Sequence, residues 1–251
     1  MFDLAGRTAL VTGGARGIGL AIGEALAGWG AQLVIVDRDA GNGARAVAEL
    51  SAKGLAASFI EADITESAVV EAVLDRAWAE HGRVDIVVNN AGISARIPAE
   101  AYPDADLDFM VRLNLNAVFY FMRGAARRWI ADGQGGRIIN LASFAGVVAD
   151  PMSVPYAATK GAVVQMTRSC AVEWAPHGIL VNAIGPGYVR TEMTAHTLDQ
   201  PQAGATIRAK TALGGPADPS EIAGAAVYLA GAASSYVTGH ILMVDGGWTA
   251  M

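Results

Sequence analysis

A run of aliphatic residues that leads straight into a glycine-rich turn constrains the fold of this chain more than any other feature. Residues 8–11 are β-branched or aliphatic, which suits a buried parallel strand, and the turn that follows reads Gly13-Gly14-Ala15-Arg16-Gly17-Ile18-Gly19. A helical stretch, residues 20–29, comes next. The first N–H groups of a helix lack partners within the helix, so a pyrophosphate can bind there. Taken alone the glycine spacing is a weak signal, and an ordinary strand-to-helix turn is the alternative.

The composition indicates a single domain that binds a small molecule. The chain has 251 residues without a proline-, serine- or charge-rich linker, so we expect one domain over residues 1–251. Its net charge of −6 argues against nucleic-acid and membrane partners, because both require a basic surface. A single cysteine, no leader-like N-terminus and no apolar run of about 18 residues predict a cytoplasmic protein. The four histidines show no metal-ligand spacing, and we predict no metal site.

Strand-like and helix-like segments alternate along the rest of the chain. After the first strand we expect strands at residues 33–37, 57–61, 85–89, 137–141, 179–184 and 241–244, and helices at residues 40–52, 66–80, 105–129, 154–174 and 219–230. This alternation predicts a doubly wound α/β (Rossmann) fold, with a seven-stranded parallel sheet and helices on both faces. Residues 188–216 show little periodicity, and we predict that they form a mobile cover over a substrate site.

Carboxylates at two predicted strand ends concern the choice of cofactor. Asp37 ends the second strand, where a carboxylate accepts hydrogen bonds from the ribose hydroxyls of NAD and repels the 2′-phosphate of NADP. Arg16 and Arg38 oppose this effect, since either is able to meet a 2′-phosphate. Asp63, just past the third strand, either caps the next segment or reaches the adenine amino group. We predict NAD as the cofactor.

Tyr156 and Lys160 lie four residues apart at the start of a predicted helix, so they share one face, on the edge of the sheet that also carries Ser143. An ammonium close to a phenol favours the phenolate, which turns a poor base into a useful one. Two ordinary surface residues are the alternative when this pair is taken alone. Asn114 lies inside a helical pattern, where it either satisfies its own backbone at a kink or anchors a water near the site.

The order and spacing of these motifs match those of one family. Over essentially its whole length the chain resembles the short-chain dehydrogenase/reductase family. The resemblance implies a catalytic tetrad of Asn114, Ser143, Tyr156 and Lys160. It also implies a cofactor site made of Gly13, Arg16, Gly17, Ile18, Gly19, Asp37, Asp63, Ile64, Asn90, Ala91, Gly92, Tyr156, Lys160, Pro186, Gly187, Val189 and Thr191. Gly185 departs from the alanine usual in the family, and we expect no functional loss from it.

The same resemblance implies a mechanism of hydride transfer. Tyr156 takes the proton of an alcohol as the hydride leaves for the nicotinamide, and Ser143 hydrogen-bonds the same oxygen. Lys160 lowers the pKa of the tyrosine and holds the nicotinamide ribose, while Asn114 retains a water that connects Lys160 to solvent. The cofactor supplies the hydride chemistry and the protein positions it.

The expected substrate site is mostly apolar. Its candidate contacts are Ser94, Ser143, Val148, Met152, Tyr156 and Met193. With few charges nearby, this composition predicts a neutral secondary alcohol, and the segments at 186–193 and 244–251 look most like those of polyol and sugar-alcohol dehydrogenases. The alternatives are a 3-oxoacyl thioester (acyl carrier protein or CoA) reductase, which usually prefers NADPH, and an NAD-binding sensor or scaffold without turnover.

The apolar content also bears on assembly. Hydrophobic residues make up 53% of the chain and charged residues only 17%, so we expect part of the apolar surface to be covered by another subunit. The family commonly pairs the helices equivalent to 105–129 and 154–174 across a dimer axis, and associates further through its last helix and strand. We predict a homotetramer, with a dimer as the smaller possibility.

Overall fold

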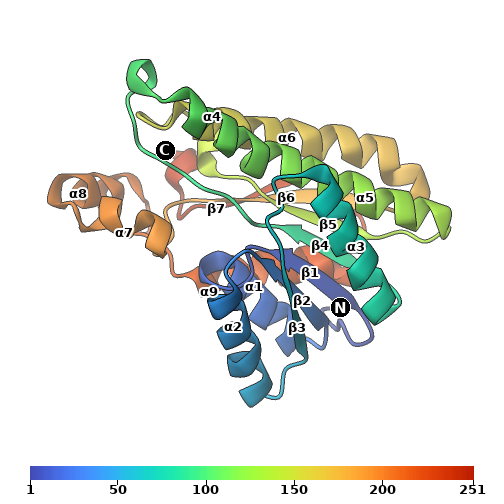
Figure 1. The fold of residues 1–251 in the computed structure, drawn as a ribbon. Helices are drawn as coiled ribbons and strands as arrows, with labels where there is room; N and C mark the ends of the chain where they lie inside the picture. Colours follow the sequence, from blue (N-terminus) through green and yellow to red (C-terminus); the bar gives the residue numbers. More distant parts are fainter.

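The computed structural model describes all residues from 1 to 251 and contains one seven-stranded parallel sheet in the order β3-β2-β1-β4-β5-β6-β7 (Figure 1). The strands are β1 Thr8–Thr12, β2 Gln32–Asp37, β3 Ala57–Glu61, β4 Ile86–Asn89, β5 Arg137–Leu141, β6 Leu180–Pro186 and β7 Ile241–Val244. The order reverses between β1 and β4, and ligands bind at such a reversal, beyond the carboxyl ends of the strands. The predicted doubly wound fold is confirmed.

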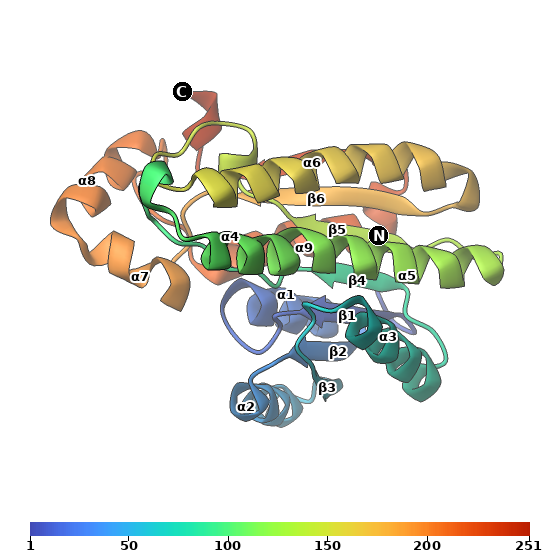
Figure 2. The same cartoon turned by 45° about the horizontal axis from the view of Figure 1, so that its top comes forward.

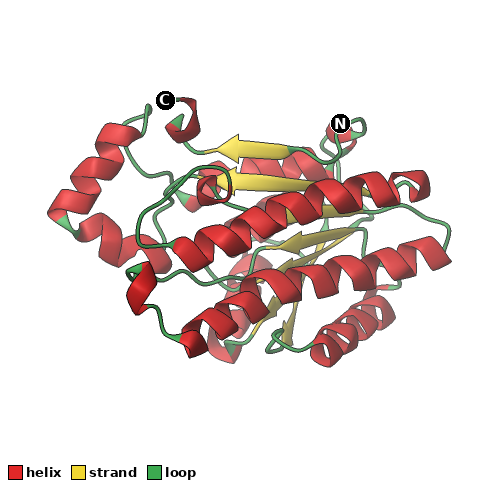
Figure 3. Cartoon of the chain, turned by 90° about the horizontal axis from the view of Figure 1, so that it is seen from above, coloured by secondary structure: helices red, strands yellow, loops and turns green.

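Helices cover both faces of the sheet (Figures 2 and 3). The strands direct alternate side chains to the two faces. The helices of the sheet layers are α1 Gly17–Gly28, α2 Ala40–Ala52, α3 Ser67–His81, α4 Asp104–Val111, α5 Ala117–Ala131, α6 Val154–Trp174 and α9 Pro219–Ala230. On β1, Leu10 packs into the core beneath α3, α5 and α6, whereas Ala9 and Val11 pack into the core beneath α1, α2 and α9. Because both faces are covered, the strands are apolar on both sides.

The helix predicted over residues 105–129 is not continuous. Between α4 and α5 the backbone forms one π-helical turn, Arg112–Asn116, which inserts an extra residue into the helix. A π-helical turn of this kind is common at functional sites. It carries the buried Asn114, so the position of this polar residue inside an apolar helical pattern was the signal for the interruption.

The segment predicted as a mobile cover, residues 188–216, contains two helices. It contains α7 Glu192–Asp199 and α8 Pro201–Lys210, which lie to one side of the sheet, at the left of Figure 1. Thr191 and Thr194 form a reciprocal capping box that starts α7, and a proline occupies the first turn of α8. Both helices are short and polar, which is why periodicity did not reveal them. No helix of this structure has the length and apolarity needed to cross a membrane.

Candidate active site

A cleft of about 540 Å³ lies at the carboxyl ends of the strands, between the sheet and the α7 segment. It brings together all but one of the residues predicted to hold a cofactor: Gly13, Arg16, Gly17, Ile18, Asp37, Asp63, Ile64, Asn90, Ala91, Gly92, Tyr156, Lys160, Pro186, Gly187, Val189 and Thr191. The exception is Gly19, which packs against the backbone of Gly13. The cleft therefore coincides with the crevice expected where the strand order reverses.

The turn between β1 and α1 requires glycine for steric reasons. Gly13 has a φ of +61°, and a Cβ there would lie 2.9 Å from the Cα of Ala91. A Cβ on Gly19 would overlap the carbonyl oxygen of Gly13, so Gly19 allows the helix to pack against the turn. No side chain caps the start of α1 at Arg16, which leaves the first N–H groups of the helix available to an anion. These features fit a dinucleotide pyrophosphate.

Asn90 and Thr12 hold the turn against the end of β4. The Asn90 amide nitrogen donates to the carbonyl oxygens of Thr12 at 2.9 Å and Gly13 at 3.0 Å, and the Thr12 hydroxyl accepts the backbone N–H groups of Asn90 and Ala91. The side chain of Asn90 is thus used within the protein. Its backbone and the small residues after it form the cleft wall.

The acidic residues lie at the edge of the cleft formed by β2 and β3. Asp37 ends β2, and one of its carboxylate oxygens accepts the N–H of Ala15 in the glycine turn at 3.3 Å. This contact positions the carboxylate beside the turn, with Arg38 also lining the cleft. Asp63 accepts both the N–H and the hydroxyl of Thr65, so the local capping contact is present although the residue also lines the cleft.

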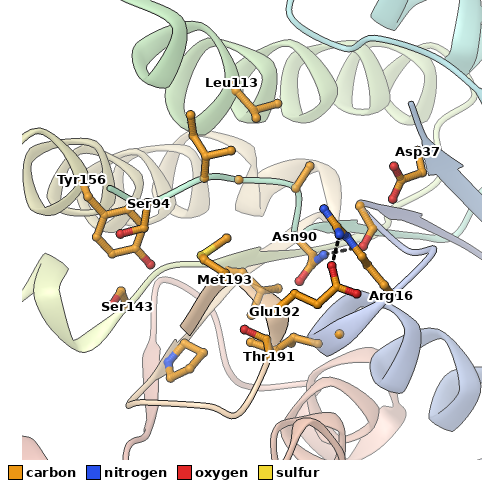
Figure 4. A pocket seen from close by; sticks show the side chains of 18 of the residues that line it. Arg16, Asp37, Asn90, Ser94, Leu113, Ser143, Tyr156, Thr191, Glu192 and Met193 are labelled. Carbon is orange, nitrogen blue, oxygen red and sulfur yellow. Dashed lines mark hydrogen bonds and ion pairs between the residues drawn. The ribbon is translucent and has the colours of Figure 1, made fainter. Parts of the chain in front are cut away.

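Ser143 and Tyr156 converge on one end of the cleft. Ser143 follows β5, and Tyr156 lies in the first turn of α6. Figure 4 shows the hydroxyl group of Tyr156 directed toward Ser143. Burial raises the pKa of the Tyr156 phenol, a hydrogen bond with Ser143 offsets part of this rise, and the negative charge of Asp150 adds to it. The phenol is therefore set to be protonated at neutral pH.

Lys160 is buried one helical turn beyond Tyr156. Its Nζ donates to the carbonyl oxygen of Leu141 at 2.6 Å and lies 5.7 Å from the centre of the Tyr156 ring. Burial lowers the pKa of this lysine from 10.5 to about 8. We expected Lys160 to lower the pKa of the tyrosine, whereas in the structure the burial of the phenol dominates and the net direction is upward.

Asn114 joins two segments that flank Lys160. Its side-chain oxygen accepts the N–H of Ile93 at 2.9 Å, and its nitrogen donates to the carbonyl of Ile93 at 2.8 Å and approaches the Thr159 hydroxyl at 3.4 Å. The kink interpretation required this amide to bond to its own helix backbone. It bonds to Ile93 instead. It fixes the loop after β4, where a Cβ on Gly92 would lie 3.2 Å from the asparagine and 3.7 Å from Lys160 Nζ.

The predicted substrate residues divide into two groups. Ser94, Ser143, Tyr156 and Met193 line the cleft, whereas Val148 and Met152 do not and are partly exposed to solvent. The sequence interpretation missed Phe109 and Leu113, which also line the cleft and come from α4 and the π-helical turn. The position of Leu113 directly before Asn114 was the signal for it.

Arg96 and Asp150 form an ion pair at the edge of this region. Arg96 donates to a carboxylate oxygen of Asp150 at 3.0 Å, to the Tyr188 hydroxyl at 3.2 Å and to the carbonyl of Pro151 at 2.9 Å. Ser153 donates to the same carboxylate at 2.9 Å. The charge of Arg96 is thus balanced within the protein.

Comparison with known proteins agrees with this geometry. A family model described as enoyl-(acyl carrier protein) reductase matches residues 13–249. Gluconate 5-dehydrogenase of Gluconobacter oxydans is 40% identical, and the alignment covers 99% of this chain and 97% of that protein. The chain belongs to the short-chain dehydrogenase/reductase family. Like other members of this short-chain dehydrogenase/reductase family, it is an oxidoreductase that exchanges a hydride between a nicotinamide cofactor and a secondary alcohol or ketone.

Two further relatives show how closely this short-chain dehydrogenase/reductase matches known members. Galactitol 2-dehydrogenase (L-tagatose-forming) of Cereibacter sphaeroides is 42% identical, with 99% of this chain and 97% of that protein covered. A crystal structure of a gluconate 5-dehydrogenase from Burkholderia cenocepacia in complex with NADP and tartrate superimposes with a TM-score of 0.96 at 41% identity. That superposition covers 100% of this chain and 98% of the other.

Proposed function

We propose that this protein is an NAD-dependent dehydrogenase of a neutral polyol or sugar alcohol. The observation that carries the proposal is the placement of two uncharged hydroxyl side chains, Ser94 and Ser143, beside Tyr156 (Figure 4). Apolar side chains, among them Met193, line the same cleft. Two small hydroxyl groups among apolar walls suit a substrate with several hydroxyls and no charge. The relatives that act on galactitol and on D-threitol, which is the named substrate of a 39% identical enzyme of Mycolicibacterium smegmatis, support this class.

The proposed roles follow from the positions of the side chains. Tyr156 exchanges the hydroxyl proton of the substrate, and Ser143 hydrogen-bonds the same oxygen and stabilises its developing charge. Lys160 holds the nicotinamide ribose, and Asn114 keeps the loop after β4 in place beside Lys160. The α7 and α8 helices close over the substrate. A bound nicotinamide supplies the hydride acceptor in oxidation and the hydride donor in reduction.

A sugar acid is a second candidate substrate. Gluconate 5-dehydrogenases are among the relatives, and the Burkholderia structure contains tartrate, a dicarboxylate. A carboxylate needs a cation, and the charge of Arg96, two residues beyond Ser94, is already balanced by Asp150. A neutral substrate is therefore favoured.

A substrate panel tests the proposal. We expect NADH formation with galactitol, threitol or another neutral polyol, at a kcat/KM at least about tenfold above that with gluconate, equivalent to about 1.4 kcal/mol. A reversed ratio would favour the sugar-acid dehydrogenase. Activity with a 3-oxoacyl thioester and NADPH alone would favour the thioester reductase, and nucleotide binding without turnover on any substrate would favour the sensor.

Asp37 is the residue that we propose selects NAD over NADP. A carboxylate that bonds both ribose hydroxyls loses those bonds when a 2′-phosphate is present, and like-charge repulsion replaces them. We expect the wild type to prefer NAD at least about tenfold in kcat/KM, and Asp37→Ser to shrink or invert that preference. The measurement is the ratio of kcat/KM for NAD and NADP with one good alcohol. An equal use of both cofactors by the wild type, or an unchanged ratio in the variant, would contradict the role of Asp37.

We propose that the protein assembles as a homotetramer, with a dimer as the smaller possibility. Phe119 on α5 and Val154 and Val172 on α6 are exposed, with 79% of Val172 accessible, and the edge strand β7 is half-buried throughout. These surfaces are those that the family commonly uses for association. Light scattering at micromolar concentration is expected to give a mass of about four subunits, and a monomer mass would contradict the proposal.

A further inference from the structure

Arg16 and Glu192 form an ion pair across the mouth of the cleft. Arg16 directly precedes α1, Glu192 is the first residue of α7, and Figure 4 shows their side chains meeting between the two segments. The start of α1 and the start of α7 are already in contact, since a Cβ on Gly17 would lie 3.6 Å from Thr191. Both side chains are more than half exposed, at 56% and 72%. A pair this exposed is weak enough to be exchanged for another partner.

The position of Arg16 makes its partner relevant to the cofactor. The N–H of the preceding residue, Ala15, donates to Asp37, the carboxylate at the expected ribose site. The charge of Arg16 also reaches Asp39, where it is one of the smaller causes of a lowered carboxyl pKa, after hydrogen bonds from Asn42. Arg16 is thus a cation close to where a 2′-phosphate would lie, and Arg38 is the other that lines this part of the cleft.

A 2′-phosphate needs guanidinium partners here, because Asp37 repels it, and Arg16 is one of the two arginines that line this part of the cleft. In the structure Arg16 is bonded to Glu192 instead, so the phosphate would have to displace a carboxylate from the guanidinium before it gained the contact. Its negative charge would also lie near that of the displaced carboxylate. Glu192 therefore opposes the binding of a phosphorylated ribose twice, through the loss of the ion pair and through repulsion.

We propose that Glu192 is a positioning residue for cofactor selection, which engages Arg16 and thereby disfavours the dinucleotide that carries a 2′-phosphate. The effect adds to that of Asp37 and comes from the opposite wall of the cleft. It rests on the proposed binding of a nicotinamide dinucleotide in this cleft. It does not depend on which alcohol is the substrate.

The test is the affinity of the protein for NADH and NADPH, followed by nucleotide fluorescence without any alcohol. Glu192→Gln is expected to increase the affinity for NADPH about fivefold and to change the affinity for NADH by less than about twofold. The gain in NADPH affinity should be smaller in high salt, because the ion pair is exposed. In an Arg16→Gln background the same substitution is expected to change NADPH affinity by less than about twofold. Glu80→Gln is the matched control, because it removes an exposed carboxylate from an arginine pair on α3.

The outcomes separate the inference from the proposed function. Unchanged NADPH affinity in Glu192→Gln, with normal NADH binding, overturns the inference alone. An equal change for both nucleotides also overturns it, since the pair then only holds α7 in place. The same gain with and without Arg16 overturns the role of the ion pair. A wild type that binds neither nucleotide overturns the proposed function itself.

Discussion

Replacement of Tyr156 by phenylalanine is expected to lower kcat at least about a hundredfold and to leave NADH binding nearly unchanged. The aromatic ring still fills its buried position, but the hydroxyl that exchanges the substrate proton is gone, and general acid-base groups typically contribute 10²–10⁴-fold. Steady-state kinetics with one good polyol and fluorescence titration with NADH measure the two effects. Tyr236→Phe is the control, because that tyrosine is fully exposed.

The pH profile provides a second readout for Tyr156. Oxidation of the alcohol needs the phenolate, and burial raises the pKa of this phenol above its ordinary value of 10.0. The oxidation rate is therefore expected to increase with pH from 7 to 10, whereas reduction of the ketone, which uses the protonated phenol, is expected to show no such increase. More than about a hundredth of wild-type activity in Tyr156→Phe would contradict the role of the hydroxyl.

Replacement of Lys160 by methionine is expected to make the protein more stable and inactive. The pKa of Lys160 is lowered from 10.5 to about 8 by burial, and each pKa unit corresponds to about 1.4 kcal/mol, so the buried charge costs about 3 kcal/mol at pH 7. Methionine removes this cost but leaves the Leu141 carbonyl without its donor, which costs about 1 kcal/mol. The net gain in the free energy of unfolding is expected to be about 2 kcal/mol.

The pH dependence of this gain identifies its cause. Below pH 8 the lysine is charged in both the folded and unfolded states, and the wild type bears the full cost. Between pH 8 and 10.5 the unfolded state binds more protons than the folded state, so the wild type becomes more stable as pH rises. The advantage of Lys160→Met should therefore be largest below pH 8, decrease as pH rises and disappear before pH 10.5. At higher pH only the cost of the lost Leu141 hydrogen bond, about 1 kcal/mol, remains.

Denaturant unfolding at several pH values measures this advantage, with Lys53→Met, at an exposed lysine paired with Glu24, as the control. We expect the variant to lose at least about a hundredfold in kcat, since it can no longer hold the ribose or exchange protons. A destabilised variant at pH 7 would show that the Leu141 hydrogen bond outweighs the buried charge. Retained activity would contradict the functional role.

The local chemistry of the chain determined the fold class and the outline of the site. Local sequence patterns identify three features: the glycines that the turn needs, the apolar strands of a sheet covered on both faces, and the acidic residue at the end of β2. The bounds of α2, β3, β5, α6, α9 and β7 agree with those predicted, because each of these segments has either clear periodicity or a clear breaker at its ends. The spacing of Tyr156 and Lys160 likewise implied a shared helical face before any tertiary contact was known.

Only the tertiary structure decided features that depend on residues distant in the chain. Asn114 bonds to Ile93 and approaches Thr159, and Arg16 meets Glu192, across separations that no local pattern encodes. The opposing pKa shifts of Tyr156 and Lys160 also come from burial by several elements, and their spacing alone suggested the reverse for the tyrosine. A sequence specifies which groups are near each other along a helix or strand, whereas burial and long-range contact arise only when the elements pack.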